Sequence, residues 1–138
     1  MSSCVVWKIR RAARILTRLY DEALAPCGQT SVQLATLDAL SDLGPCTLDQ
    51  ISELNGHERS ATWRGLQPLI RKGVVQPAER AGRAGRYELT PEGSDLLKAA
   101  IERWRVIQTE VLAEAGADVD RLIAKVDKLD GAHRTVRA

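Results

Sequence analysis

The stretch from His57 to Thr90 constrains the fold most strongly, because a helix-like segment is followed directly by a basic, glycine-rich tip. Residues 58–72 are predicted to form a helix whose apolar edge would face its neighbours; this edge consists of Thr62, Leu66, Leu69 and Ile70. Residues 74–76 and 86–89 are strand candidates on either side of the tip. A two-stranded ribbon is marginal by itself, so it is expected to pack against helices.

A short helix and a turn are predicted just before this segment. Thr47 and Gln50 have the spacing of a capping box, so a helix should start at Leu48 and run to Leu54. Asn55-Gly56 is a turn dipeptide. Pro68 should bend the following helix near its last turn. The order of elements predicts a helix-turn-helix at 47–72 with a wing at 74–90, in a fold that is mainly α with a small β-wing.

Further helices are predicted on both sides of this unit. Apolar periodicity indicates helices at 4–24 and, capped by Thr30 or Ser31, up to Gly44. Thr90 should cap a long helix that Gly116 breaks, and Asp118 should cap a last helix. Residues 131–138 are expected to be frayed.

The outer helices carry wider apolar faces than one small core covers, so an obligate two-fold homodimer is predicted. The dimerisation helices would be 4–24 and 92–130, around a DNA-binding lobe at 30–90. With 138 residues, the chain fits one domain, 1–138.

Charge distribution favours a nucleic-acid partner. Between His57 and Thr90 there are seven Lys or Arg and three acidic residues, a net charge of +4, whereas the whole chain carries +2. A cationic segment on a slightly acidic body is typical of a polyanion-binding surface. An ordinary solvated helix face remains the alternative.

Residues that could contact double-stranded DNA lie on the polar edge of the 58–72 helix and on the wing. In a helix-turn-helix the second helix enters the major groove, where Arg can pair with guanine and Gln with adenine. The candidates on this helix are Arg59, Ser60, Trp63, Arg64 and Gln67; Trp63 could instead be a packing residue. Those on the wing are Arg80, Arg83 and Arg86, for a narrow minor groove. Arg86 could instead bridge wing and helix.

These segments resemble a known family over nearly the whole chain. The motif R-S-x-x-x-R-x-L-x-P-L, then G-V-V, then a wing with arginines that closes on L-T-P-E-G, is similar to MarR-family winged-helix transcriptional regulators. The resemblance implies a homodimer that reads a pseudo-palindromic operator, most commonly as a repressor, and is released by a small ligand or an oxidant. Two departures are Trp63, where members often have a small hydroxyl residue, and Ala78-Glu79-Arg80, which lacks the usual wing Asp.

Two kinds of control are conceivable. Cys4 resembles the N-terminal cysteine of redox-responsive members, and it could be oxidised or form a disulfide with Cys27 or Cys46 of a second copy. The alternative is that all three are small apolar fillers. A ligand pocket could be lined by Trp7, Arg11, Arg14 and Trp104, although both tryptophans also suit a dimer core.

Other classes fit the sequence less well. A winged-helix protein-interaction module is the alternative function, but it would not need three wing arginines. No hydrolase, phosphate-loop or paired-carboxylate motif is present, so no enzyme, cofactor or metal site is expected. An odd cysteine count without C-x-x-C, no signal peptide and no membrane-length apolar run predict a cytoplasmic protein.

Overall fold

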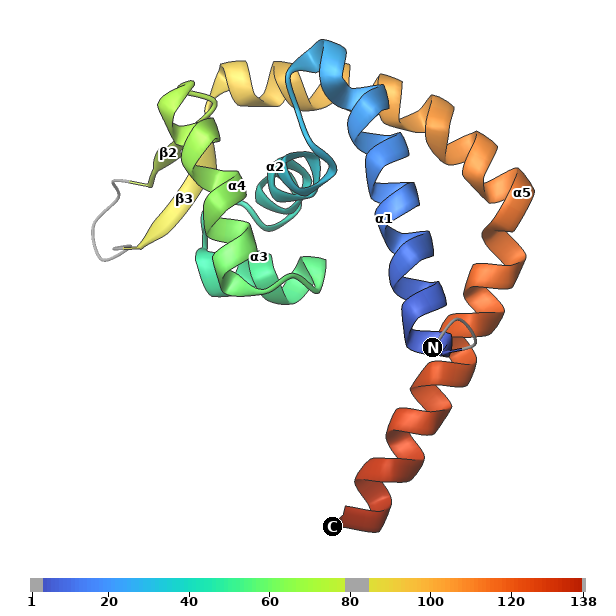
Figure 1. The fold of residues 1–138 in the computed structure, drawn as a ribbon. Helices are drawn as coiled ribbons and strands as arrows, with labels where there is room; N and C mark the ends of the chain where they lie inside the picture. Colours follow the sequence, from blue (N-terminus) through green and yellow to red (C-terminus); the bar gives the residue numbers. More distant parts are fainter. Residues whose placement is uncertain (1–3, 79–84, 138) are drawn as a thin grey trace. The chain divides into compact units, whose positions relative to one another are not determined.

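The computed structural model describes residues 4–78 and 85–137 and is mainly α-helical with a small sheet (Figure 1). In chain order the elements are α1 (Val5–Leu24), the short 3-10 helix η1 (Ala25–Cys27), α2 (Ser31–Leu43), β1 (Cys46–Thr47), α3 (Leu48–Asn55), α4 (Arg59–Arg71), β2 (Val75–Pro77), β3 (Arg86–Leu89) and α5 (Pro91–Arg137). The chain divides into two compact units, residues 1–104 and 105–138.

Helix starts follow the capping chemistry of the sequence. Thr47 accepts the Gln50 amide at 3.2 Å while the Gln50 side chain accepts the Thr47 amide at 2.9 Å, which confirms the predicted capping box of α3. Thr30 and Gln33 form a second capping box at the start of α2. Thr90 accepts the Gly93 amide and so caps α5 as predicted. These bonds satisfy backbone donors that a helix start otherwise leaves unpaired.

The core of the first unit is built around α2. Leu37 and Leu40 of α2 pack with Ile51 of α3 and with Leu66 and Leu69 of α4, and all five are buried. The predicted inner edge of α4 is therefore confirmed. This packing fixes α3 and α4 as a helix-turn-helix.

The wing belongs to a three-stranded antiparallel sheet in the order β1-β3-β2. Val75 pairs with Leu89 in the ribbon, as the strand candidates require. Strand β1 was not predicted: Cys46 pairs with Tyr87 and Thr47 with Arg86. The sheet thus ties the wing to the residues just before α3, and the fold is the predicted winged helix.

Helix α5 corrects two predictions. It runs without interruption from Pro91 to Arg137, so Gly116 does not break it and residues 131–137 are helical. A helical glycine costs only about 1 kcal/mol relative to alanine, and Gly116 lies among strong helix formers. Asp118 is not a cap but pairs with Arg121 within the helix (3.0 Å). Near the end, Asp130 and Arg134 form an i,i+4 ion pair at 2.9 Å.

None of the helices within 4–78 and 85–137 combines the length and the apolar character needed to cross a membrane.

Candidate nucleic-acid interface

Helix α4 has an inner and an outer face that follow from its sequence. Thr62, Leu66 and Leu69 are buried, whereas Trp63 and Arg64 between them are exposed. Of the predicted DNA contacts on this helix, four are exposed and Gln67 is half-buried; the exposed ones are Arg59, Ser60, Trp63 and Arg64. The outer face therefore carries two guanidinium groups that are open to a partner.

A buried pair of hydroxyl groups joins α3 to α4. The Ser52 hydroxyl donates to Thr62 Oγ1 at 3.0 Å, and the Thr62 hydroxyl donates to the Glu58 carbonyl at 3.3 Å. The single Ser52 proton has a second acceptor, the Leu48 carbonyl at 2.9 Å, and the two acceptors share it. This pair holds the first turn of α4, which begins with Arg59, against α3.

Arg59, the first residue of α4, forms an ion pair with Asp49, the second residue of α3. Arg59 Nε lies 2.9 Å from Asp49 Oδ1. Both side chains are well exposed, and exposed ion pairs contribute at most about 1 kcal/mol to stability. Asp49 was not singled out from the sequence, because a contact between two helices leaves no local pattern.

Trp63 connects α4 to the wing. Its ring lies 6.4 Å from that of Tyr87 on β3, tilted by 50°, a favourable aromatic arrangement. The side chain is nevertheless 38% exposed. Of the two roles left open by the sequence, packing is thus observed, and part of the indole remains available to a ligand.

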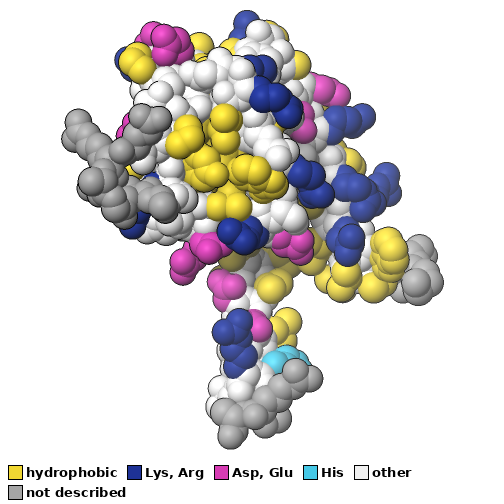
Figure 2. Space-filling view, turned by 90° about the vertical axis from the view of Figure 1, so that its left-hand side faces the viewer, with side chains coloured by type: hydrophobic (Ala, Val, Ile, Leu, Met, Phe, Trp, Pro, Cys, Tyr) yellow, Lys and Arg dark blue, Asp and Glu magenta, His cyan; other side chains and the backbone are white. Residues whose placement is uncertain are grey.

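An open groove lies between α4 and the wing, beside this aromatic pair. Its lining is Thr47, Leu48, Asp49, Arg59, Ser60, Trp63, Gly85 and Tyr87. Three of the predicted DNA contacts thus share one concave surface with a carboxylate. Figure 2 shows the side of the molecule that carries the wing, with hydrophobic side chains gathered beside Lys and Arg side chains.

Among the predicted wing arginines, Arg86 lies in the part of the chain that the structure describes. Arg86 donates from Nη1 to the Pro45 carbonyl at 3.2 Å, so it bridges the wing to the segment between α2 and β1, not to a helix as the alternative role had it. This bond crosses from β3 to the residue before β1 and explains the half-buried position of Arg86. Arg80 and Arg83, and Glu79 beside them, lie outside the described residues.

The three cysteines are free thiols in different surroundings. Cys46 is 1% exposed in the core, and burial raises the pKa of its thiol, an effect that nearby Arg86 only partly opposes. A buried, protonated thiol is a poor nucleophile. Cys4, just before α1, and Cys27 in η1 are both partly exposed, so they are the two candidates that an oxidant could reach.

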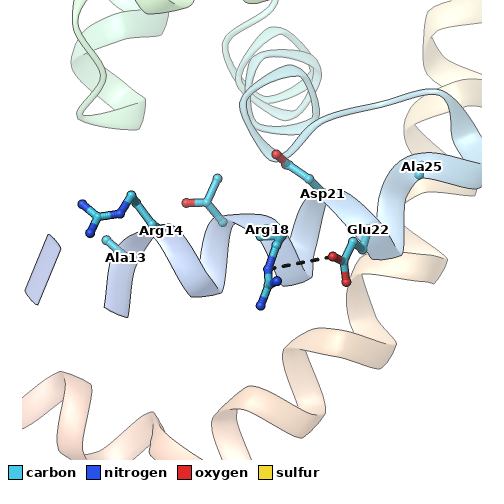
Figure 3. A pocket seen from close by; sticks show the side chains of 7 residues that line it. Ala13, Arg14, Arg18, Asp21, Glu22 and Ala25 are labelled. Carbon is cyan, nitrogen blue, oxygen red and sulfur yellow. Dashed lines mark ion pairs between the residues drawn. The ribbon is translucent and has the colours of Figure 1, made fainter. Parts of the chain in front are cut away.

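The residues predicted to line an effector pocket have separate surroundings. Trp104 packs against the hydrophobic core, whereas Trp7 is 52% exposed and Arg11 is exposed. Arg14 lines an open depression along α1 (Figure 3), where Arg18 pairs with Glu22 at 3.9 Å. Asp21 in the same depression accepts the Ser31 amide at 2.7 Å and thereby anchors α1 to α2.

No protein-family model and no curated protein matches the chain. Solved structures do match. The transcriptional regulator MosR of M. tuberculosis is 36% identical to this chain. The match covers 94% of this chain and 97% of MosR, with a TM-score of 0.80. A structure of M. tuberculosis MosR in complex with DNA is 35% identical, with 96% of this chain and 99% of that chain covered and a TM-score of 0.77.

A third match bears on the fold alone. Sco5413, a MarR family transcriptional regulator from Streptomyces coelicolor, is 22% identical, with coverage of 96% of this chain and 94% of that chain and a TM-score of 0.76. The elements that these comparisons align are the ones described above: a helix-turn-helix, a wing and flanking helices. Together with the identity to MosR over nearly the full length, they show that the chain belongs to the MarR family of winged-helix transcriptional regulators.

Proposed function

We propose that this regulator binds double-stranded DNA sequence-specifically, with α4 in the major groove and the wing over the adjacent minor groove. The observation that carries the proposal is the outer face of α4, where Arg59, Ser60, Trp63 and Arg64 are exposed while the opposite face is buried in the core. A recognition helix needs this arrangement, because its N-terminal residues must reach base edges. The DNA complex of MosR, 35% identical to this chain, supports the same partner.

Within that face the residues have different expected roles. Arg64 is exposed and can donate two hydrogen bonds to guanine, and Gln67 can pair with adenine. Ser60 suits a phosphate or a base edge. Arg80 and Arg83 would contribute attraction to the minor groove rather than base identity. Arg86 would act indirectly, since its guanidinium holds the wing against Pro45.

The functional unit of the proposal is a homodimer on a pseudo-palindromic operator. In the unit 105–138, four exposed apolar residues repeat at intervals of three and four; they are Val119, Leu122, Val126 and Leu129. This is the spacing of a coiled-coil seam, which a second helix covers. In the other unit, α1 exposes Val5, Val6, Trp7 and Ile9. A two-fold dimer would pair two recognition helices with two half-sites.

The regulatory outcome proposed is repression, relieved by a small ligand or by thiol oxidation. Repression is the commoner mode in the family that the motifs resemble. Cys4 supports the oxidation route, because its side chain is partly exposed just before α1, where an oxidant can reach it. If oxidant-triggered loss of DNA binding is unchanged in Cys4→Ser, that route does not run through this residue.

The test of DNA binding compares Arg64→Ala with Arg71→Ala. Both substitutions remove one exposed arginine from α4, but Arg71 lies in its last turn. Arg64→Ala should weaken binding to a duplex selected from the source genome by roughly 1–3 kcal/mol and relax base preference at one position. Arg71→Ala should lower the affinity for selected duplexes and for random duplexes by the same factor. Equal effects of the two substitutions would contradict the assigned groove face, and binding insensitive to salt would favour a protein-interaction module.

A further inference from the structure

The ion pair between Asp49 and Arg59 places a carboxylate on the surface that faces DNA in the proposed function. The Nε–Oδ1 distance is 2.9 Å, and the two side chains are 76% and 69% exposed. Both residues line the groove that also contains Ser60 and Trp63. Because both side chains are exposed, the pair is not needed to neutralise a buried charge. A carboxylate that faces a polyanion opposes its binding.

The carboxylate acts differently on random and on cognate DNA. Non-specific binding comes mainly from cations that neutralise phosphates and release counterions. Arg59 paired with Asp49 adds no net charge, so this site gains little from a phosphate at an arbitrary position. Asp49 therefore lowers affinity for any sequence that offers Arg59 only its backbone.

On a cognate site the same pair has a benefit. A guanidinium carries five N–H donors, and a contact through Nε does not use them all. Holding the side chain in one orientation reduces the conformational entropy that arginine loses when it docks on a base edge. On a cognate site, this entropic benefit offsets part of the electrostatic cost of Asp49. On random DNA, nothing offsets that cost.

We propose that Asp49 is a positioning residue that sets the sequence specificity of DNA binding: its carboxylate orients Arg59 and cancels the charge of Arg59 against random phosphates. The proposal rests on the proposed DNA-binding function. It is a case of specificity obtained by an element that penalises the wrong partner.

The experiment uses two duplex probes and the full-length protein. One probe is the duplex that the wild type enriches most from a random-sequence pool, and the other is the unselected pool. Dissociation constants are measured over a series of salt concentrations for the wild type, Asp49→Asn and the control Glu92→Gln. The control removes the same charge from an acidic residue in the first turn of another helix, α5.

Asp49→Asn is expected to bind the unselected pool about fivefold more tightly and to steepen the slope of log K against log salt by about 0.9, as for one additional phosphate contact. The enriched duplex should gain less, so the ratio of the two affinities falls. Glu92→Gln should leave that ratio unchanged. In the Arg59→Ala background, Asp49→Asn should no longer change the ratio, since Asp49 acts through Arg59.

The outcomes separate the two proposals. If the wild type discriminates but Asp49→Asn keeps the same ratio, or changes it equally without Arg59, the role of Asp49 is overturned while DNA recognition stands. If the wild type enriches no duplex and binds all sequences alike, sequence-specific function fails, and the specificity role of Asp49 fails with it. Thermal unfolding of each variant shows whether a loss of fold contributes.

Discussion

At the residue scale, two buried hydroxyl groups hold the recognition helix to its neighbour. Ser52 lies on α3 and Thr62 on α4, and their 3.0 Å hydrogen bond is buried. Ser52 also lies 2.9 Å from the Leu48 carbonyl, which gives its proton a second acceptor. Such a bond fixes direction as well as distance, which apolar packing alone does not.

Thr62→Val should lower the free energy of unfolding by about 1 kcal/mol. Valine keeps the volume but removes the bonds to Ser52 and to the Glu58 carbonyl, while the Leu48 carbonyl limits the loss by accepting the Ser52 proton. Urea denaturation measures the change. The matched control is Thr109→Val, which removes an exposed hydroxyl that donates to the carbonyl of Arg105 at 2.8 Å; a change within about 0.5 kcal/mol is expected there. Equal destabilisation by both would show that the inter-helix bond contributes nothing.

Thiol reactivity should separate the three cysteines. Because burial raises the pKa of Cys46, its thiol stays protonated and inaccessible at neutral pH. Alkylation of the folded protein should therefore modify Cys4 and Cys27 first, and Cys46 only at the rate at which the core opens. Peptide mass spectrometry after a timed pulse of iodoacetamide reads out the sites. Modification of Cys46 as fast as Cys4 would contradict its placement in the core.

At the site, the sequence predicted which residues are exposed better than it predicted which residues they contact. The outward residues of α4 follow from its 3.6-residue periodicity: Arg59, Ser60, Trp63 and Arg64 are exposed as expected, whereas Gln67 is half-buried. The partners of Arg86 and Trp63 were not predicted. Arg86 bonds Pro45, 41 positions away, and Trp63 meets Tyr87 across the wing. Contacts between distant segments depend on how elements pack, and a single sequence contains no local signal for them.

At the scale of elements, capping signals were more informative than breaker signals. The capping box of α3 and the Thr90 cap were predicted, because a side chain and a nearby backbone group settle them locally. Gly116 was wrongly read as a break, since its cost of about 1 kcal/mol is small beside the cooperativity of a long helix. Strand β1 has two residues and no periodicity to detect.

Two glycines of α5 should respond oppositely to the same substitution. A Cβ at Gly93 would overlap the Val74 carbonyl oxygen, so Gly93→Ala must displace backbone between α5 and the start of the wing. It should destabilise the protein by about 1–3 kcal/mol. At Gly131 the added methyl meets open space, so Gly131→Ala should increase helix stability by up to about 1 kcal/mol.

Chemical denaturation measures the first effect. Amide hydrogen exchange of residues 127–137 measures the second, because local opening at a helix end is its main readout. If Gly93→Ala is tolerated, the close approach of α5 to Val74 is wrong. Unchanged or faster exchange in Gly131→Ala would argue that the end of α5 is not helical in solution.

At the scale of the whole molecule, the apolar residues left exposed are as informative as those buried. In the unit 105–138, the seam residues Val119, Leu122, Val126 and Leu129 are 38–61% exposed. Scattered exposed apolar residues are normal, but a repeated seam on one helix indicates a covered surface. The sequence predicted such a seam from its pattern, although it divided the helix at Gly116.

The homodimer proposed here predicts that Leu122→Lys weakens self-association and, with it, operator binding. A lysine on the seam must bury its charge or separate the helices, which costs several kcal/mol. Ala124→Lys is the matched control: it adds the same charge to the same helix, two residues on and therefore about 200° around the helix axis from Leu122. Sedimentation velocity over a dilution series measures the association, and circular dichroism confirms that both variants remain helical. Dimers of equal strength in both variants would place the interface elsewhere. Monomers that still bind a two-half-site operator with full affinity would separate DNA recognition from dimerisation, because a dimer gains affinity by engaging both half-sites at once.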